Sequence, residues 1–575
     1  MKLSNVVALV SLLTTSGAAP SQQDRSRGRP SKNPNFLFIL ADDLDNQMNS
    51  PAYMPKTLSR VKDRGVELAN HFVTTALCCP SRVALWTGRQ AHNTNVTDVN
   101  PPWGGYPKFV SQGFNDDWFP VWMQDAGYNT YYTGKLMNSH SLETYNDPFV
   151  KGFNGSDFLL DPYTYSYYNS TYQRNQDPPK SYEGHYTTDV ITEKSMGFLN
   201  DALESDRPFF FTVAPIAPHS NVDNLEDFAV MTEAIPAPKH RHLFKDVKLP
   251  RTPNFNPVDS TGVSWVKTLE RQNQTVVEYE DHFYRQRLRA LQSLDELVDV
   301  LLDRLEESGE IDNTYIIFSS DNGYHIGQHR MPPGKSTGFE EDIRVPFYIR
   351  GPGIPEGESV TSTTTHIDLV PTFFELAGIP LREDFDGTPA PIRQGTAGTK
   401  HEHVAVEFWG DVGFEGEFSR IGIDADTHLL NNSYKSARIL SEEYNLYYAV
   451  WCTNEHELYD LSADPYQMKN LYSAAKRTND RYLGRPLQAV QDRLDALVLV
   501  LQSCQGPTCI KPWSVIHPDG SVQNLKDALS PKYDKFYEAQ PKVSFESCLD
   551  GYIISNEGPQ VGLQYRNGLS WEAWT

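Results

Sequence analysis

The chain has 575 residues, of which 39% are hydrophobic, and its 51 Lys and Arg against 74 Asp and Glu give a net charge of −23. This length exceeds one average domain and predicts two domains and a tail. The acidic balance argues against a nucleic-acid or anionic-membrane partner and against tight binding along a long polyanion, although it allows a local basic pocket.

The first 19 residues have the pattern of a cleaved secretory signal: Lys2, an apolar stretch over 6–13 and small residues over 16–19. That stretch is too short to span a bilayer, and no other segment approaches the necessary length. Residues 20–33 read as a polar linker. We therefore expect a secreted protein (extracellular, cell wall, or vacuolar or lysosomal lumen) without membrane insertion, a membrane anchor being the less favoured alternative. Five Asn-X-Ser/Thr triplets are then N-glycosylation candidates: Asn95, Asn154, Asn169, Asn273 and Asn431.

Five apolar runs have the length and the β-branched or aromatic content of buried strands: 35–40, 128–133, 208–214, 314–320 and 345–350. Helical patterns lie between them. The clearest covers 285–307, where leucines recur mostly at three- and four-residue spacing. Alternating strands and helices predict an α/β fold over residues 34–400, with a large mixed, mostly parallel sheet and helices on both faces.

A smaller α+β domain is expected over 401–512. Runs at 403–409 and 447–451 alternate like strands of an antiparallel sheet, 457–471 reads as a strand, a turn and a helix start, and 487–502 reads as a helix packed on that sheet. Between 351 and 400 the pattern loosens into loops with one short helix at 367–378. Residues 513–575 have no clear periodicity and predict a tail packed on the surface.

Polar residues follow four of the predicted strands, at the point where each strand ends. They are Asp42-Asp43, Gly134-Lys135, Pro218-His219 and Asp321-Asn322. Because open α/β sheets bind ligands outside the carboxyl ends of their strands, these residues should converge on one edge. Asp42, Asp43, Asp321 and Asn322 offer only hard oxygen ligands, which suit Ca²⁺ or Mg²⁺ rather than Zn²⁺. A single Asp-Asp pair, taken alone, more often caps a helix or faces water.

Residues 78–89, CCPSRVALWTGR, place a sulfur beside a permanent cation at the start of a predicted helix. Pro80 restricts the backbone there, and Arg82 lies four residues after Cys78, on the same side of the first turn. Such a helix N-terminus is an anion site. The alternative is a pair of buried cysteines followed by a simple helix cap, and the segment alone leaves the two interpretations level.

The pattern Cys-X-Pro-Ser-Arg followed by Thr-Gly resembles the activation sequence of the sulfatase family. In that family the first cysteine is oxidised during secretion to formylglycine, whose hydrate is the nucleophile. The resemblance runs from about residue 34 to about residue 512 and implies an alkaline-phosphatase-like sulfatase fold. It also implies that formylglycine-generating machinery modifies Cys78. The implied metal is calcium, with Mg²⁺ the less favoured ion, and its ligands would be Asp42, Asp43, Cys78, Asp321 and Asn322.

The same resemblance implies four basic groups around the substrate's sulfate: Arg82, Lys135, His219 and Lys335. Many sulfatases have Gly-Lys-X-His where this chain has Met137, and Asn138 follows. This form resembles the branch that contains the N-acetylglucosamine-6-sulfatases. Asn138, His325 and His329 are pocket candidates, and His325 is the preferred substitute for the missing histidine. Taken singly, a lysine is usually a surface charge and a histidine usually structural.

Four further cysteines form an even set for an oxidising compartment. Cys504 and Cys509 enclose a short Gly-Pro loop and are plausible partners, which would leave Cys452 to pair with Cys548. Four cysteines allow three pairings, so the connectivity stays open.

These features favour a secreted calcium-dependent sulfatase of the arylsulfatase type that acts on small sulfate esters. The alternatives are an exo-sulfatase on sulfated sugars such as N-acetylglucosamine 6-sulfate, a phosphate or phosphonate ester hydrolase, and a silent glycan-binding relative. A phosphate hydrolase would favour Ser or Thr at Cys78, and a silent relative should have lost Cys78, Arg82 or a metal carboxylate. The aromatic stretch 162–172 and the basic loop 239–251 are candidates for the entrance, or else packing and surface charge.

Overall fold

The computed structural model describes residues 33–224, 229–392, 401–419, 431–472 and 481–566. The signal expected over 1–19 and nearly all of the linker expected over 20–33 lie outside these residues. Within the described ranges, no helix has the length and apolar character needed to cross a membrane.

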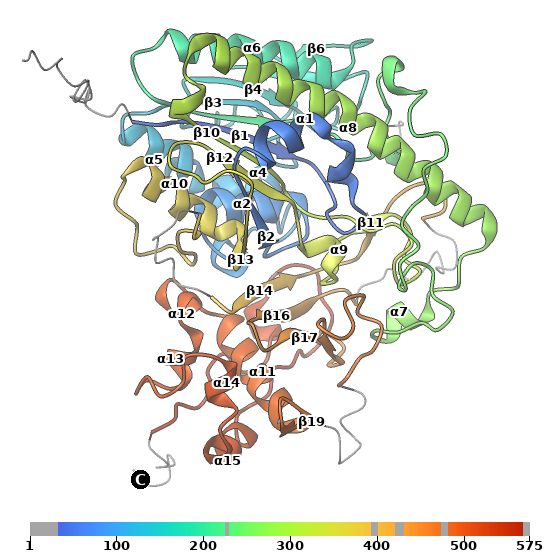
Figure 1. Cartoon of the computed structure of the whole chain (residues 1–575), viewed down its shortest axis with the longest axis vertical. Helices are drawn as coiled ribbons and strands as arrows, with labels where there is room; N and C mark the ends of the chain where they lie inside the picture. Colours follow the sequence, from blue (N-terminus) through green and yellow to red (C-terminus); the bar gives the residue numbers. More distant parts are fainter. Residues whose placement is uncertain (1–32, 225–228, 393–400, 420–430, 473–480, 567–575) are drawn as a thin grey trace, which may run out of the picture. The chain divides into compact units, whose positions relative to one another are not determined.

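Ten strands form one mixed sheet in the order β13-β2-β12-β10-β1-β7-β3-β4-β5-β6 (Figure 1). Four parallel neighbours lie at its centre: β10 (Thr314–Ser320), β1 (Asn35–Ala41), β7 (Phe209–Ala214) and β3 (Asn129–Gly134). They correspond to four of the predicted runs. The strands that end in polar residues are therefore side by side, with their carboxyl ends at one edge.

The outer strands include elements that the apolar runs did not predict. On one side β12 (Phe347–Arg350) pairs antiparallel with β10, followed by β2 (Val66–Phe72) and β13 (Glu358–Thr365). On the other side β4 (Gly155–Leu159) continues the parallel direction, β5 (Thr171–Arg174) runs antiparallel to β4, and β6 (Lys180–Ser181) runs antiparallel to β5. The expectation of only loops and one short helix over 351–400 is thus wrong for β13, whose sequence is polar.

Successive side chains of β1 enter two different cores, because side chains alternate across a sheet. Leu37 and Ile39 pack with α6 (Thr187–Glu204) and α8 (Gln274–Ser308), which lie side by side (Figure 1). Phe36 and Phe38 pack with the opposite layer, made of α2 (Cys78–Thr87), α5 (Phe119–Asp125) and α10 (Leu369–Ala377). Helices therefore cover both faces, as predicted.

The second sheet is antiparallel and contains β14 (His403–Phe408), β16 (Tyr434–Leu440), β17 (Asn445–Trp451) and β18 (His456–Asp460). Helix α11 (Leu487–Leu501) packs on it. The predicted fold class is confirmed. The described residues between β18 and 472 form turns, whereas a helix start was expected there.

Short helices follow α11: α12 (Pro507–Ile510), α13 (Pro512–Ile516), α14 (Leu525–Ala528) and α15 (Asp534–Glu538). The tail has no clear periodicity because these helices are too short to show one. Its residues Tyr533, Tyr537 and Phe545 are buried in the same core as α11. Other short elements include α3 (Ala91–Thr94), α9 (Glu340–Ile343), β8 (Asn221–Asn224) with β9 (Ala229–Thr232), and β11 (Gly334–Lys335) with β15 (Gly413–Phe414).

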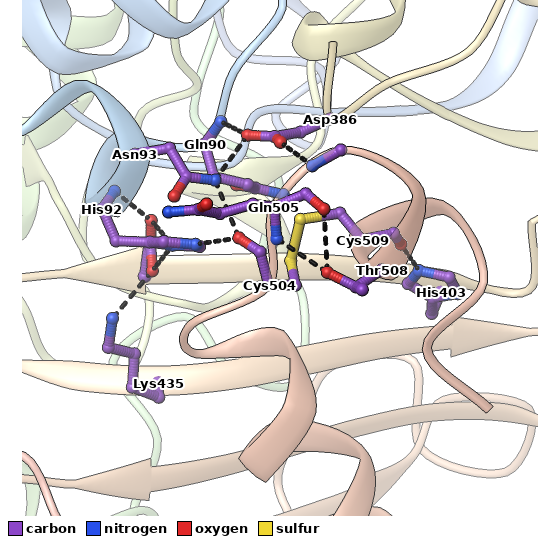
Figure 2. Close-up of a disulfide and its surroundings, with 12 residues drawn as sticks. Gln90, His92, Asn93, Asp386, His403, Lys435, Cys504, Gln505, Thr508 and Cys509 are labelled. Carbon is purple, nitrogen blue, oxygen red and sulfur yellow. Dashed lines mark hydrogen bonds and ion pairs between the residues drawn. A yellow bond between two sulfur atoms is a disulfide. The ribbon is translucent and has the colours of Figure 1, made fainter. Parts of the chain in front are cut away.

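Both expected disulfides are present, Cys452–Cys548 and Cys504–Cys509. Figure 2 shows that the second one closes a loop against α3. The Cys504 carbonyl accepts hydrogen bonds from His92 Nε2 at 2.9 Å and Asn93 Nδ2 at 2.8 Å. Since α3 follows α2 after only three residues, this loop supports the far end of the helix that begins at Cys78.

Candidate active site

Three carboxylates and one amide meet at the carboxyl ends of β1 and β10. Asp42 and Asp43 follow β1, Asp321 and Asn322 follow β10, and all four side chains are fully buried. Hydrogen bonds connect the two turns, because Asp321 Oδ1 accepts from the Asp43 backbone N–H at 3.1 Å and Asn322 Nδ2 donates to Asp43 Oδ1 at 2.8 Å. The parallel pairing of the strands thus brings residues 278 positions apart into contact.

Cys78 is the first residue of α2 and lies directly beside this acidic cluster. Its Sγ is 3.6 Å from Asp42 Oδ1, 3.9 Å from Asp43 Oδ1 and 3.1 Å from Lys335 Nζ. Cys79, by contrast, packs into the apolar core beneath the sheet. The helix N-terminus predicted at Cys78 is present, and the unpaired backbone N–H groups of its first turn add positive potential there.

Arg82 and Lys135 are both fully buried, and each contacts the carboxylates. Arg82 Nε donates to Asp321 Oδ2 at 2.8 Å, and its Nη2 is 3.8 Å from Asp42 Oδ2. Lys135 Nζ donates to Asp42 Oδ1 at 2.8 Å and lies 4.7 Å from the ring centre of Tyr165. These two cations therefore hold Asp42 and Asp321 in place.

Lys335 and His219 contact a different carboxylate of the cluster, that of Asp43. Lys335 Nζ donates to Asp43 Oδ1 at 2.6 Å and Oδ2 at 2.7 Å. His219 Nε2 is 3.5 Å from Asp43 Oδ2, while its Nδ1 is 2.7 Å from the Ser220 carbonyl, which selects the Nδ1–H tautomer for a neutral ring. His219 and Lys335 therefore both lie beside Asp43, and Lys335 also contacts Cys78.

Burial and ion pairing set the charge states. Burial and the neighbouring Asp321 raise the pKa of Asp42. Burial also opposes ionisation of Asp43, but Lys335 and His219 outweigh it and lower its pKa. For Asp321, Arg82 and Lys135 overcome burial in the same way, and its pKa is also lowered. Burial raises the pKa of the Cys78 thiol even though Lys135 and Lys335 oppose it.

The donor set fits a hard divalent cation. Ligand atoms of Asp42, Asp43, Cys78 and His219 all lie within 4.8 Å of one another. Asn322 Oδ1 is buried and has no hydrogen-bond partner among the described residues, while its Nδ2 is fully used. An unpartnered amide oxygen beside three carboxylates is what an oxygen-preferring ion such as Ca²⁺ requires.

Met137 and Asn138 show what replaces the Gly-Lys-X-His pattern. The Met137 side chain is buried in the apolar core, so it does not enter the site. Asn138 Nδ2 donates to the Tyr165 hydroxyl at 2.6 Å, and the Tyr165 ring stacks on His219 with centroids 4.1 Å apart. Tyr165 comes from the aromatic stretch 162–172, for which the sequence predicted either a part of the entrance or packing.

His325 and His329 each keep one buried ring nitrogen, Nε2 and Nδ1 respectively, without a hydrogen-bond partner among the described residues. His325 Nδ1 is 2.8 Å from Asp342 Oδ1, and the residue pairs through its backbone with Gly334, next to Lys335. His329 stacks on Phe339 at 4.0 Å, and burial with His325 nearby lowers its pKa to about 3. His325 thus neighbours the strand that carries Lys335, whereas His329 packs on Phe339.

Two supporting residues were missed because no local pattern marks them. Arg287, in the middle of α8, donates to the Asp43 carbonyl and, at 3.2 Å, to the Pro218 carbonyl. Glu415 accepts from the Ser220 hydroxyl and, at 2.7 Å, from the Tyr324 hydroxyl. Glu415 directly follows β15, which pairs with the strand that carries Lys335.

A sulfatase family model matches residues 34–379, and a second model, described as N-sulphoglucosamine sulphohydrolase, C-terminal, matches residues 327–490. An arylsulfatase from Volvox carteri is 39% identical over 549 residues, covering 91% of this chain and 83% of that protein. An N-acetylglucosamine-6-sulfatase from Capra hircus is 32% identical over 512 residues, with 84% and 86% covered.

Among solved structures, one described as a complex with its substrate D-glucosamine-2-N,6-O-disulfate superimposes with a TM-score of 0.60. It is 22% identical and covers 77% of this chain and 94% of its own, so it shows a shared fold. The family match covers more than half of the chain, and the Volvox arylsulfatase matches nearly all of it. This chain therefore belongs to the sulfatase family and is a sulfuric ester hydrolase.

Proposed function

We propose that this sulfatase is a secreted, calcium-dependent enzyme of the arylsulfatase type, which uses a formylglycine made from Cys78 to release inorganic sulfate from aryl sulfates. One observation carries the proposal. The side chain of Cys78 lies beside both a buried oxygen-ligand cluster and Lys335, at the N-terminus of α2. The proposed nucleophile, the proposed metal site and a lysine that we assign to the sulfate are therefore adjacent.

Two groups would complete this site. Formylglycine at Cys78, installed by formylglycine-generating machinery, would supply a nucleophilic hydroxyl, and Ca²⁺ held by Asp42, Asp43, Asp321 and Asn322 would supply positive charge beside the sulfate. Mg²⁺ is the less favoured ion because it demands a small, regular octahedral site.

The residues of the chain then divide into two roles. Lys335 and His219 both contact Asp43, and Lys335 also contacts Cys78, so we assign them to the sulfate oxygens. One of them also donates a proton to the ester oxygen as its bond to sulfur breaks, so that the product leaves as a neutral phenol or alcohol. Arg82 and Lys135 stabilise the carboxylates, and through them the position of the cation.

Secretion is supported by the two disulfides, since such bonds form in oxidising compartments. The relative from Caenorhabditis elegans named as a putative extracellular sulfatase homologue is 32% identical over 389 residues. Of the five glycosylation candidates, Asn154 and Asn273 are exposed, and Asn95, Asn169 and Asn431 are half-buried. Asn154 and Asn273 are therefore the first sites to test for glycans.

Sulfated sugars are the second candidate substrate class. Asn138, which marks the N-acetylglucosamine-6-sulfatase-like form of the Gly-Lys element, is linked to the site through its hydrogen bond to Tyr165. The goat relative carries that enzyme name over most of both chains. A Tyr165 ring stacked on His219 could limit the room beside the sulfate for either an aryl ring or a sugar.

Three experiments test the modification of Cys78, its role in sulfate release and the substrate preference. Mass spectrometry of the peptide containing Cys78, from enzyme made in a competent eukaryotic host, should show the aldehyde in a substantial fraction. Cys78→Ala should abolish sulfate release while leaving the thermal unfolding transition intact. A panel of one aryl sulfate and several sulfated monosaccharides, scored by kcat/KM, then separates the two substrate classes.

Each part of the proposal can fail separately. Only thiol at Cys78 in fully active enzyme would remove the formylglycine assignment. A sulfated monosaccharide favoured over the aryl sulfate would replace the arylsulfatase type by the sugar sulfatase. Elemental analysis of purified enzyme that finds no divalent cation together with full turnover would remove the metal assignment.

A further inference from the structure

A basic segment crosses the outer side of α8. Residues 237–251 contain five Lys or Arg and one Asp, whereas the whole chain has 51 basic and 74 acidic residues. Two of these five cations belong to internal ion pairs, Lys239 with Glu296 at 2.5 Å and Arg251 with Asp281 at 2.7 Å. The segment is therefore locally opposite in charge to the protein as a whole.

The other three cations of the segment have no ion-pair partner among the described residues. Arg241, Lys245 and Lys248 are exposed, and Arg285 and Arg289 of α8 are half-buried next to the segment. Within the described residues, none of these five has a carboxylate in ion-pair contact, and Asp246 is the one acidic residue between 237 and 251. We call this set the basic surface: Arg241, Lys245, Lys248, Arg285 and Arg289.

The two arginines of α8 fix the segment in position. Arg285 Nη1 donates to the Val247 carbonyl at 3.0 Å, and Arg289 Nε donates to the Leu243 carbonyl at 2.8 Å. Phe244, between those carbonyls, packs edge-on against Tyr53 at 5.2 Å. Each guanidinium keeps further N–H groups for an external ligand, and a cation held in place loses less entropy on binding an anion than a mobile one.

The like charges of Arg285 and Arg289 repel each other. Burial and the neighbouring Arg285 lower the pKa of Arg289, and neither arginine has a carboxylate in ion-pair contact among the described residues. Such a cluster is unfavourable in isolation and becomes favourable when an anion neutralises it. Sulfate groups suit it, because guanidinium groups donate paired hydrogen bonds to tetrahedral oxyanions.

The basic surface lies on the same helix that supports the catalytic site. Arg287, between Arg285 and Arg289, points inward and donates to the Asp43 carbonyl. Earlier on α8, the Tyr279 hydroxyl accepts from the Glu417 backbone N–H at 2.9 Å, just after Glu415. Tyr279 and Arg289 are ten residues apart, or about 15 Å along the helix. A ligand that spans this length of α8 must be a chain of several units.

We propose that the basic surface binds a sulfated polysaccharide, so that one segment of the chain docks on α8 while a sulfate ester of the same chain or a neighbouring one is hydrolysed. This inference rests on the proposed function, with sulfated sugars as the substrate. The net charge of −23 repels any polyanion at longer range, so the binding is moderate and strongly weakened by salt.

The experiment measures retention of the full-length enzyme on immobilised heparin, used as a model sulfated polysaccharide, and its dissociation constant for soluble heparin at several NaCl concentrations. The test variant is R241A/K245A/K248A, whose side chains are exposed. The matched control is K511A/K532A/K535A, three exposed lysines in the segment of short helices after α11. A second test variant, R285Q/R289Q, removes the guanidinium groups that contact the segment.

We expect the wild type and the control to be retained, and the triple test variant to lose affinity by about tenfold or more with a shallower salt dependence. Equal losses in test and control variants, or no retention of the wild type, would overturn the proposal. So would equally tight binding to phosphatidylserine vesicles, which would indicate a membrane surface instead. Turnover of a small aryl sulfate should be unchanged in the triple variants, which separates failure of docking from failure of the catalytic assignment.

Discussion

Lys335 Nζ lies 3.1 Å from Cys78 Sγ and also contacts both carboxylate oxygens of Asp43, at 2.6 and 2.7 Å. One cation is therefore shared between a proposed metal ligand and the proposed nucleophile. A change in the charge of Asp43 should therefore affect Cys78 through Lys335.

Replacing Lys335 should impair chemistry more than folding. Lys335→Ala removes a charge that contacts Asp43 and Cys78 and that we assign to the sulfate, so we expect kcat to fall by about 10²-fold or more, as for other transition-state donors. Steady-state kinetics with an aryl sulfate measure this. Lys335→Arg, which keeps the charge but changes its position, should recover only part of the activity. Wild-type kcat in Lys335→Ala, with the variant folded, would show that the lysine has no part in the reaction.

Glu415 should act as a positioning residue from outside the main sheet. Its carboxylate accepts from the hydroxyls of Ser220, next to His219, and Tyr324, close to Asn322. Glu415→Ala leaves two buried hydroxyls unpaired, so we expect a loss of about 2 kcal/mol in stability and a fall in kcat with a smaller change in KM. Glu415→Gln keeps one acceptor oxygen and should be intermediate in both. A thermal unfolding scan beside the kinetics separates the two effects, and equal kinetics in all three proteins would refute the role.

Glu280 should make stability depend on pH. Burial, opposed by Gln272 and Arg251, raises its pKa to about 8 from an ordinary 4.5, and its Oε2 has no hydrogen-bond partner among the described residues. Because the folded state holds the proton more tightly, the stabilisation is complete below about pH 4.5 and is lost as pH rises through about 8. The total is on the order of 3 to 5 kcal/mol.

Chemical denaturation of the wild type and Glu280→Gln at acidic, neutral and alkaline pH measures that effect. The neutral glutamine cannot ionise, so the variant should gain stability relative to the wild type as pH rises. Parallel curves for the two proteins would mean that Glu280 does not titrate in this range.

The two disulfides should differ in their contribution to stability. Cys504–Cys509 closes a loop with a separation of 5 residues, and Cys452–Cys548 closes one of 96. In the chain-entropy model the short loop contributes about 2 kcal/mol and the long one about 4.7 kcal/mol. Paired Cys→Ser variants, compared by denaturant midpoint, test this order. A larger loss for the short loop would point instead to its contacts with His92 and Asn93.

The centre of the sheet was readable from sequence because buried parallel strands leave continuous apolar runs, as in β1, β7 and β10. An apolar run carries no direction, so the antiparallel placement of β12 could not be read from it. The edge strand β13, ESVTSTTT, is polar and mostly accessible, and it gave no such signal.

The residues of the candidate site likewise include some that the sequence predicted and some that it did not. Asp42, Lys135 and Asp321 were found because each follows a strand end directly, where geometry fixes the edge they occupy. Glu415 and Arg287 reach the site across 195 and 244 positions of sequence, from a loop and from a helix interior. Their roles depend on tertiary packing, for which one sequence offers no local pattern.

The pairing of β15 with β11 has a practical consequence for protein engineering. Gly413 lies opposite Lys335, and Glu415 follows two residues later, although both come after the expected end of the catalytic domain at residue 400. A chimera that joins residues 34–400 of this enzyme to the smaller domain of a relative would therefore exchange part of the active site as well. Substrate preference could then travel with a domain that holds neither the proposed nucleophile nor the proposed metal ligands.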